Sequence, residues 1–137
     1  MTEKTNVRVG WLKFMYAYTI VGAGTTGLGI LLIPETMKSV FGIPPTDPVV
    51  IGLWGSVFVA FAILSIFGLR APIKYIPVLM LQFCYKSVWF LAVVLPLLIK
   101  NEFPAYAVTL AMIFVTYIIG DIIAIPLPFV LSREATP

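Results

Sequence analysis

The sequence predicts an all-α fold: an integral membrane four-helix bundle with N and C termini both cytoplasmic. Composition, four long apolar stretches and the distribution of basic residues predict it. Of 137 residues, 61% are hydrophobic and 11% are charged, whereas a soluble domain carries about a quarter charged residues. A helix needs about 20 apolar residues to cross the hydrocarbon core. Four such stretches leave no room for a soluble domain, so residues 1–137 are expected to form a single transmembrane domain.

The first two spans are expected at residues 11–33 and 48–69. Pro34 ends the first span, and residues 35–41 are expected to form a short helix at the membrane surface. Gly42 suits the C-terminal end of that helix. The second span begins after Asp47, because aspartate is a favoured N-cap and Pro48 fits the first helical position.

The third and fourth spans are expected at residues 74–99 and 103–131. Pro96 lies inside the third span and should kink it near Ala92, whose carbonyl loses its hydrogen-bond donor. The fourth span should reach at least Ile125. Pro126 and Pro128 then either kink its last turns or convert them to an extended exit.

Basic residues set the expected orientation. With four spans, both termini lie on one side of the membrane. That side carries Lys4, Arg8, Lys13, Arg70, Lys74 and Arg133, and the other side carries Lys38 and Lys100. Because cytoplasmic loops are enriched in Lys and Arg, the six-to-two bias places both termini in the cytoplasm.

Two charges lie at membrane depth: Lys86 in the third span and Asp121 in the fourth. Intramembrane charges are costly and usually mark function. Lys86 is 12 residues from Lys74, and Asp121 is 12 residues from Arg133, which puts both about 18 Å from the cytoplasmic flank. Counting from the outer turn leaves a mismatch of about 7 Å. Whether the two side chains pair directly or through water therefore stays open.

Polar and aromatic residues accompany these charges at helical spacing. Gln82 and Trp89 share a helix face with Lys86, and Tyr117 shares one with Asp121. These five residues form the polar seam, a hypothetical ligand-binding or proton-handling site that could solvate a ligand head group or hold a chain of waters. The competing interpretation, given equal weight, is a structural pair that fixes helix register. Catalytic residues are not identifiable.

Small residues at four-residue spacing predict close helix packing. The expected packing positions are Gly22, Gly27, Gly52, Ser56 and Gly120. Contact between the first and second spans of one chain is favoured over a dimer contact, because a four-helix chain must first pack against itself.

The sequence lacks the residues that several kinds of metal, cofactor and nucleotide sites require. It has no histidine and one cysteine, and it contains no phosphate-binding or dinucleotide-binding motif. No cofactor, no metal and no nucleic-acid partner are expected. The expected partners are membrane lipids, with either a homo-oligomer or partner membrane subunits.

One pattern carries a family resemblance. It runs Leu31-Leu32-Ile33-Pro34, Val40-Phe41-Gly42-Ile43-Pro44, Asp47-Pro48, Gly52-Leu53-Trp54-Gly55-Ser56 and Arg70-Ala71-Pro72. The region from Gly22 to Leu98 resembles the DoxX-like small four-helix bacterial membrane proteins. The resemblance implies a bundle in the bacterial inner membrane. Some relatives are associated with quinone-linked oxidation complexes and many have no assigned activity, so no functional residue is carried over.

Three functions follow as hypotheses. The favoured one is a non-enzymatic membrane protein, either an accessory subunit or a binder of a lipophilic molecule (lipid or quinone) whose head meets the polar seam. The second is a small proton- or ion-coupled transporter working as a homo-oligomer. The third is a membrane enzyme on a hydrophobic substrate, with Asp121 as base and Lys86 or Tyr117 as its partner. The lack of histidine and of a second nearby acid weighs against the third.

Overall fold

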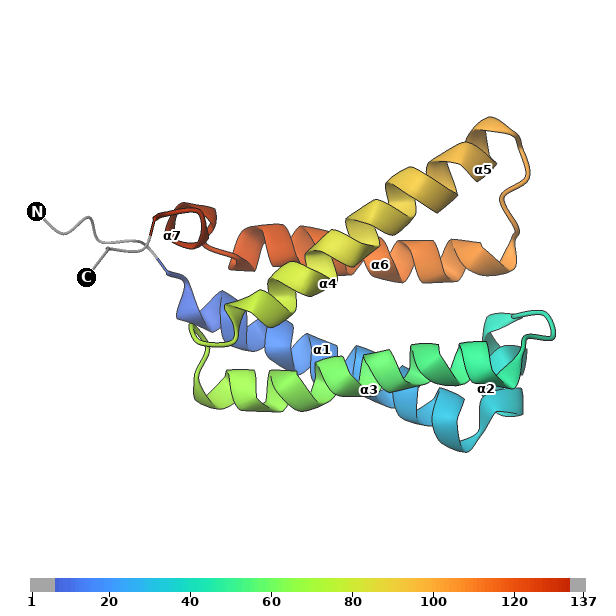
Figure 1. Cartoon of the computed structure of the whole chain (residues 1–137), viewed down its shortest axis with the longest axis horizontal. Helices are drawn as coiled ribbons and strands as arrows, with labels where there is room; N and C mark the ends of the chain where they lie inside the picture. The colour runs from blue at the N-terminus through green and yellow to red at the C-terminus, as the bar shows by residue number, and fades with distance from the viewer. Residues whose placement is uncertain (1–6, 134–137) are drawn as a thin grey trace, which may run out of the picture.

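The computed structural model describes residues 7–133. Their helices are α1 (Val9–Leu32), α2 (Pro34–Phe41), α3 (Pro48–Arg70), α4 (Ile76–Trp89), the π-helical η1 (Phe90–Val94), α5 (Leu95–Ile99), α6 (Tyr106–Ala124) and α7 (Leu127–Val130) (Figure 1). Four helices are long and apolar enough to span a membrane: α1, α3, α6 and the continuous helix Ile76–Ile99. The chain is therefore an integral membrane protein with an all-helical fold, as the sequence predicted. Lys4, which entered the orientation argument, lies outside the described residues.

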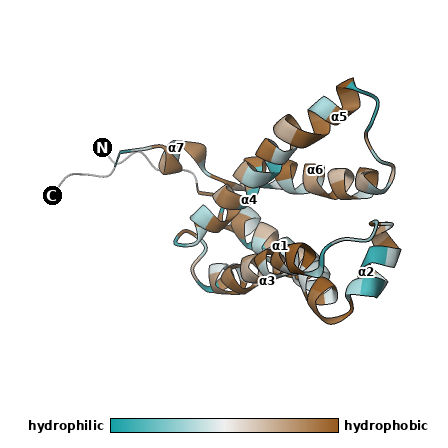
Figure 2. Cartoon of the chain, turned by 45° about the vertical axis from the view of Figure 1, so that its right-hand side comes forward, coloured by the Kyte–Doolittle hydropathy of each residue, from teal (hydrophilic) through white to brown (hydrophobic). Residues whose placement is uncertain are grey.

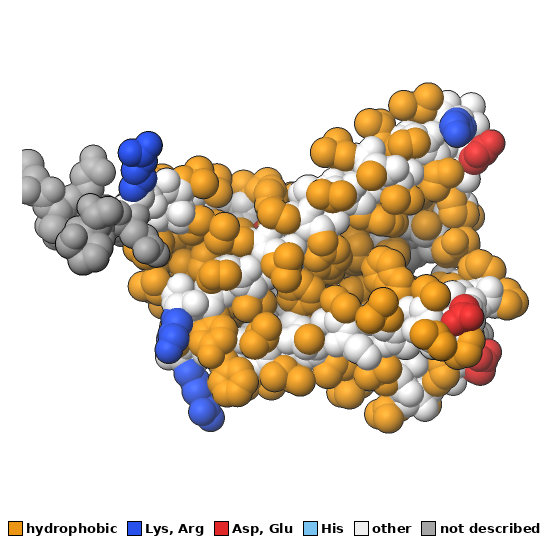
Figure 3. Space-filling view, in the orientation of Figure 1, with side chains coloured by type: hydrophobic (Ala, Val, Ile, Leu, Met, Phe, Trp, Pro, Cys, Tyr) orange, Lys and Arg blue, Asp and Glu red, His pale blue; other side chains and the backbone are white. Residues whose placement is uncertain are grey.

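The long helices alternate in direction, so α1 and α4 begin at the end of the bundle where α3 and α6 finish (Figure 1). We call this the terminal end, since the described part of the chain begins and ends there. In Figure 3 most of the visible Lys and Arg side chains lie at the terminal end, while acidic side chains and a basic one are seen at the opposite end. In Figure 2 the long helices are mostly hydrophobic, while α2 carries hydrophilic residues.

The α1–α3 pair makes the most extensive helix contact, and glycines permit it. A Cβ on Gly27 would lie 2.8 Å from the backbone oxygen of Gly55. The predicted positions Gly52 and Ser56 lie outside this contact: a Cβ on Gly52 would meet nothing within 4 Å, and the exposed Ser56 hydroxyl donates to the Gly52 carbonyl of its own helix. Helix α3 instead turns the face of Gly55 and Phe58 inward, because that face buries a large aromatic ring.

The predicted glycines Gly22 and Gly120 lie in a different contact, between α1 and α6. Gly22 packs against the Tyr117 hydroxyl, and Gly120 packs against Met15. Without side chains of their own, both glycines let an opposing side chain reach the helix backbone. The small residues therefore bring α1 close to two helices rather than one.

The third span contains the predicted distortion. Helix α4 passes through π-helical η1 before α5, and the Leu95 N–H donates to the Phe90 carbonyl five residues earlier. Pro96 follows directly and has no N–H to donate to Ala92. The wider turn around Ala92 is how the helix accommodates the missing donor.

The fourth span is shorter than the expected 103–131. Helix α6 begins at Tyr106 and ends at Ala124, Ile125 is extended at φ −71° and ψ 120°, and α7 starts at Leu127. The break follows from Pro126, because a residue before proline disfavours the helical conformation. Of the two outcomes expected at Pro126, a kink or an extended exit, the extended exit describes Ile125. The single turn of α7 then follows.

The short helix α2 and the start of α3 carry the predicted caps. Gly42 ends α2 in the left-handed conformation at φ 68°, which favours glycine. The Asp47 carboxylate accepts hydrogen bonds from Val49 N at 2.8 Å and Val50 N at 3.2 Å. Asp47 is therefore the predicted N-cap of α3.

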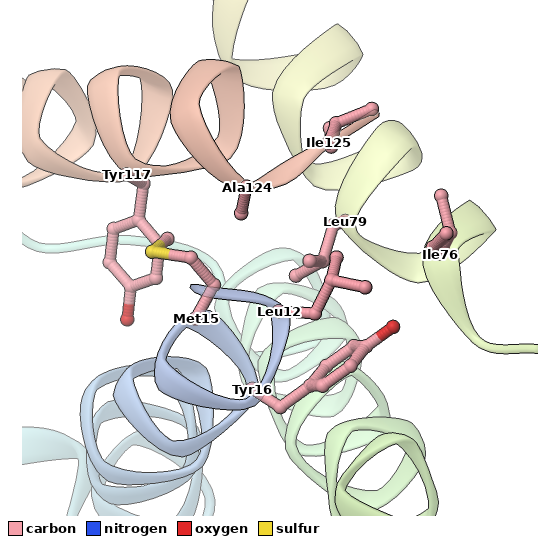
Figure 4. Close-up of a cluster of buried hydrophobic side chains, with 8 residues drawn as sticks. All are labelled: Leu12, Met15, Tyr16, Ile76, Leu79, Tyr117, Ala124 and Ile125. Atoms are coloured by element: carbon pink, nitrogen blue, oxygen red, sulfur yellow. The ribbon is translucent and has the colours of Figure 1, made fainter. Parts of the chain in front are cut away.

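An apolar core closes the terminal end of the bundle. This terminal cluster comprises Leu12, Met15, Tyr16, Ile76, Leu79, Tyr117, Ala124 and Ile125 (Figure 4). It joins α1, α4 and α6. The Tyr16 hydroxyl also donates to the carbonyl of Pro72 at 2.7 Å, which ties α1 to the α3–α4 connection. Tyr117 belongs both to this cluster and to the polar seam.

Candidate functional site

Lys86 is buried in the middle of the bundle, with 2% of its surface exposed. Its ammonium donates to the Tyr85 hydroxyl at 2.8 Å. The Nζ atom lies 4.4 Å from the ring centroids of both Tyr85 and Tyr117, 4.8 Å from that of Phe114 and 6.0 Å from that of Phe61. Aromatic rings attract a cation through their negative faces. The lysine charge is thus stabilised mainly by rings.

Asp121 is fully buried, at 0% exposure. Neither carboxylate oxygen has a hydrogen-bond partner within the described chain. Among residues 7–133 the ion pair found joins Lys38 and Glu35, at 3.2 Å, and none joins Asp121 to Lys86. The two intramembrane charges are therefore neighbours in the bundle but do not form a direct pair.

The register of α6 explains why the direct pair does not form. Two rings of α6, those of Phe114 and Tyr117, lie beside Lys86. The nearer one, Tyr117, lies four residues before Asp121, a rise of about 6 Å along the helix. The equal spacing counted from Arg133 assumed a continuous helix, but α6 ends at Ala124. Counting from the turn between the third and fourth spans places Lys86 and Asp121 at depths that differ by about 7 Å. That count describes the structure better.

The three other residues of the polar seam, Gln82, Tyr117 and Trp89, do not lie together. Gln82 is buried, and its Oε1 accepts from Thr19 Oγ1 at 3.2 Å. The Tyr117 hydroxyl donates to the carbonyl of Tyr18 on α1 at 3.3 Å. Trp89 lies further along the chain and makes an edge contact with Phe114 at 5.2 Å between centroids. Gln82 thus bonds to α1, whereas Trp89 belongs to the cavity described next.

A large cavity of about 330 Å³ lies between α1, α2, α3, the third span and α6. In Figure 3 the molecule is hollowed between its two halves, on the side away from the termini. The lining is almost entirely apolar and includes Met37 of α2, Trp54 of α3, Trp89 and Leu97. The cavity suits a hydrocarbon chain or an aromatic ring.

A small cavity of about 170 Å³ adjoins the large one and is bordered by Tyr85, Lys86 and Tyr117. The two cavities share the lining residues Thr26, Phe41, Phe58 and Leu110. An apolar space therefore leads toward the Lys86 ammonium and two phenol rings.

Sequence reasoning missed several residues at this site. Tyr85 and Phe114 complete the ring environment of Lys86, and buried Thr19 and Ser65 lie on the other two helices. Being polar residues inside predicted spans, Thr19 and Ser65 offered a signal, but hydroxyls are common on membrane helices. Aromatic residues give no such signal, because they also anchor the ends of spans at the membrane interfaces.

Comparisons with known proteins found no matching family model, no matching curated protein and no matching solved structure.

Proposed function

We propose that this protein binds a lipophilic molecule, a lipid or a quinone, within the membrane. The observation that carries the proposal is the large apolar cavity, of about 330 Å³, that adjoins a buried lysine through the small one. Ligand sites are concave and mostly apolar, with a few polar groups that fix orientation. Here the apolar part would hold the ligand's tail or ring.

Lys86 supplies the polar contact in this proposal. An ammonium has three N–H donors, and the Tyr85 hydroxyl takes one. The others can serve a carbonyl, phosphate or carboxylate oxygen of the ligand's head. Burial among aromatic rings raises the value of that contact, because no water competes for it.

The test is native mass spectrometry of the gently extracted protein, comparing wild type with Leu110→Trp. Leu110 borders both cavities, so the added ring would fill their junction. Val108→Trp is the matched control, because Val108 is 49% exposed on the same helix and lines neither cavity. We expect a co-purifying lipophile in wild type and in Val108→Trp, with loss in Leu110→Trp. A bare protein in all three would contradict the proposal.

The second candidate is a proton- or ion-coupled transporter working as a homo-oligomer. It is favoured by the unpartnered carboxylate of Asp121, since an intramembrane acid without a partner is typical of proton and ion pathways. Asp121→Asn should abolish coupled flux into proteoliposomes while leaving the fold intact. Unchanged flux would remove this candidate.

The setting of the protein is also part of the proposal. We infer the bacterial inner membrane from the resemblance to DoxX-like proteins, and cytoplasmic termini from the excess of basic residues. A role as an accessory subunit with partner membrane proteins is compatible with a ligand site of this size. Labelling of single cysteines introduced at residues 5 and 101, in a Cys84→Ala background, would test the orientation in intact cells.

A further inference from the structure

Four membrane helices each place one polar side chain at the same level of the bundle. This polar layer consists of Thr19 on α1, Ser65 on α3, Gln82 on α4 and Asp121 on α6. Their exposures are 0%, 0%, 1% and 0%. On α4 and α6 its members lie one helical turn closer to the terminal end than Lys86 and Tyr117 do.

Contacts of α1 and α4 fix the level of two members. Thr19 lies three residues after Tyr16 of the terminal cluster. Gln82 lies three residues after Leu79 of the same cluster and four before Lys86. The hydrogen bond of 3.2 Å from Thr19 Oγ1 to Gln82 Oε1 joins them directly.

Contacts of α3 and α6 bring the other two members to that level. Ser65 lies between Phe61, whose ring is near Lys86, and Gly68, which packs on Tyr16 of the terminal cluster. Asp121 lies in the same way between Tyr117 beside Lys86 and Ala124 in the terminal cluster.

The layer has polar atoms without partners. Both Asp121 oxygens and the Ser65 hydroxyl are buried with no hydrogen bond inside the described chain. Among the described residues the opposite charge at membrane depth is Lys86, which donates to the Tyr85 hydroxyl and lies against the Tyr85 and Tyr117 rings. An ionised carboxylate buried without compensation is very costly, so the layer calls for a cation of its own.

We propose that the polar layer binds a monovalent metal cation, and that this cation is sodium. The donor atoms are all oxygens: the Asp121 carboxylate, the Thr19 and Ser65 hydroxyls and the Gln82 amide oxygen. Hard cations prefer oxygen ligands. A proton needs only one acceptor, whereas a metal ion needs several, and four helices that each bring a buried oxygen donor to this level therefore favour a metal ion. The site is separate from the lipophile cavities.

The first experiment is thermal unfolding of the detergent-purified protein at fixed pH and chloride, with sodium replaced stepwise by N-methylglucamine. At ten times its Kd, sodium raises the folded-to-unfolded ratio about elevenfold, which for a chain of this size raises Tm by about 5 °C. Binding of ²²Na⁺ to the same preparation, displaced by unlabelled sodium, gives an independent measurement.

Three variants give the experiment its controls. Asp121→Asn should lose the sodium response and ²²Na⁺ binding. Ser65→Ala should weaken binding by about tenfold, the equivalent of one lost polar contact. Ser56→Ala is the matched control, because Ser56 is exposed and bonds only within its own helix; it should behave as wild type.

Three results would overturn the proposal. The first is a wild-type Tm that does not respond to sodium, even if it responds to acid, since that would leave a proton as the occupant. The second is an undiminished sodium response in Asp121→Asn. The third is equal binding by Ser65→Ala and Ser56→Ala, which decides the matter even if Asp121→Asn fails to fold.

Discussion

Replacing Gly27 by alanine tests the packing of α1 on α3. The new Cβ would lie 2.8 Å from both the Gly55 oxygen and the Val59 nitrogen, and 2.9 Å from Phe58 Cβ. Ordinary contacts begin at 3.4 Å, so the helices must separate by about 0.6 Å. Neither backbone atom can move without its helix. Overpacking of this kind costs about 1–3 kcal/mol.

Gly52→Ala is the matched control, because a Cβ there would meet nothing within 4 Å. Both substitutions gain about 1 kcal/mol of helix propensity, which cancels in the comparison. We therefore expect Gly27→Ala to be less stable than Gly52→Ala by about 1–3 kcal/mol. The assay is reversible unfolding in mixed detergent and dodecyl sulfate, followed by circular dichroism. Equal stabilities would refute the assigned α1–α3 contact.

Three further substitutions have expected outcomes. Asp47→Ala should lower the free energy of unfolding by about 1 kcal/mol, because α3 loses its N-cap; Asp47→Asn should retain stability in the same assay. Tyr16→Phe should cost about 1 kcal/mol through the lost hydrogen bond to Pro72, and unchanged unfolding would contradict that bond. Lys86→Met should leave stability near wild type, because an apolar side chain of similar length replaces a buried charge, yet the co-purified lipophile should disappear from the native mass spectrum.

The membrane spans could be predicted from the sequence because lipid imposes a local rule. Every backbone polar group in hydrocarbon must bond within its own helix, so apolar length alone identifies a span. The cap at Asp47 and the distortion before Pro96 are local in the same sense. The expected range 103–131 ran past the end of α6 at Ala124, because hydropathy continues beyond the point where the backbone turns. Pro126 marked that point, and an exit from the helix there was one of the two alternatives.

The site depended on geometry that no local pattern contains. Lys86 and Asp121 were identifiable as buried charges from their depth, but their spacing along two helices could not show that Tyr117 lies opposite Lys86. A shift of α6 by about one helical turn, about 6 Å along its axis, decides whether Lys86 and Asp121 form an ion pair or belong to two independent polar sites. The cavity likewise depends on how two pairs of helices diverge.

The sequence by itself determined that this chain lies in a membrane, where its helices begin, and which two charges are buried there. Those properties follow from hydropathy, proline and capping, which act over a few residues. Only the tertiary structure decided that Gly55 rather than Gly52 faces α1, that Lys86 is surrounded by rings, and that Thr19, Ser65, Gln82 and Asp121 are all buried. The rotation and register of each helix are set by side-chain packing against its neighbours, which hydropathy does not encode.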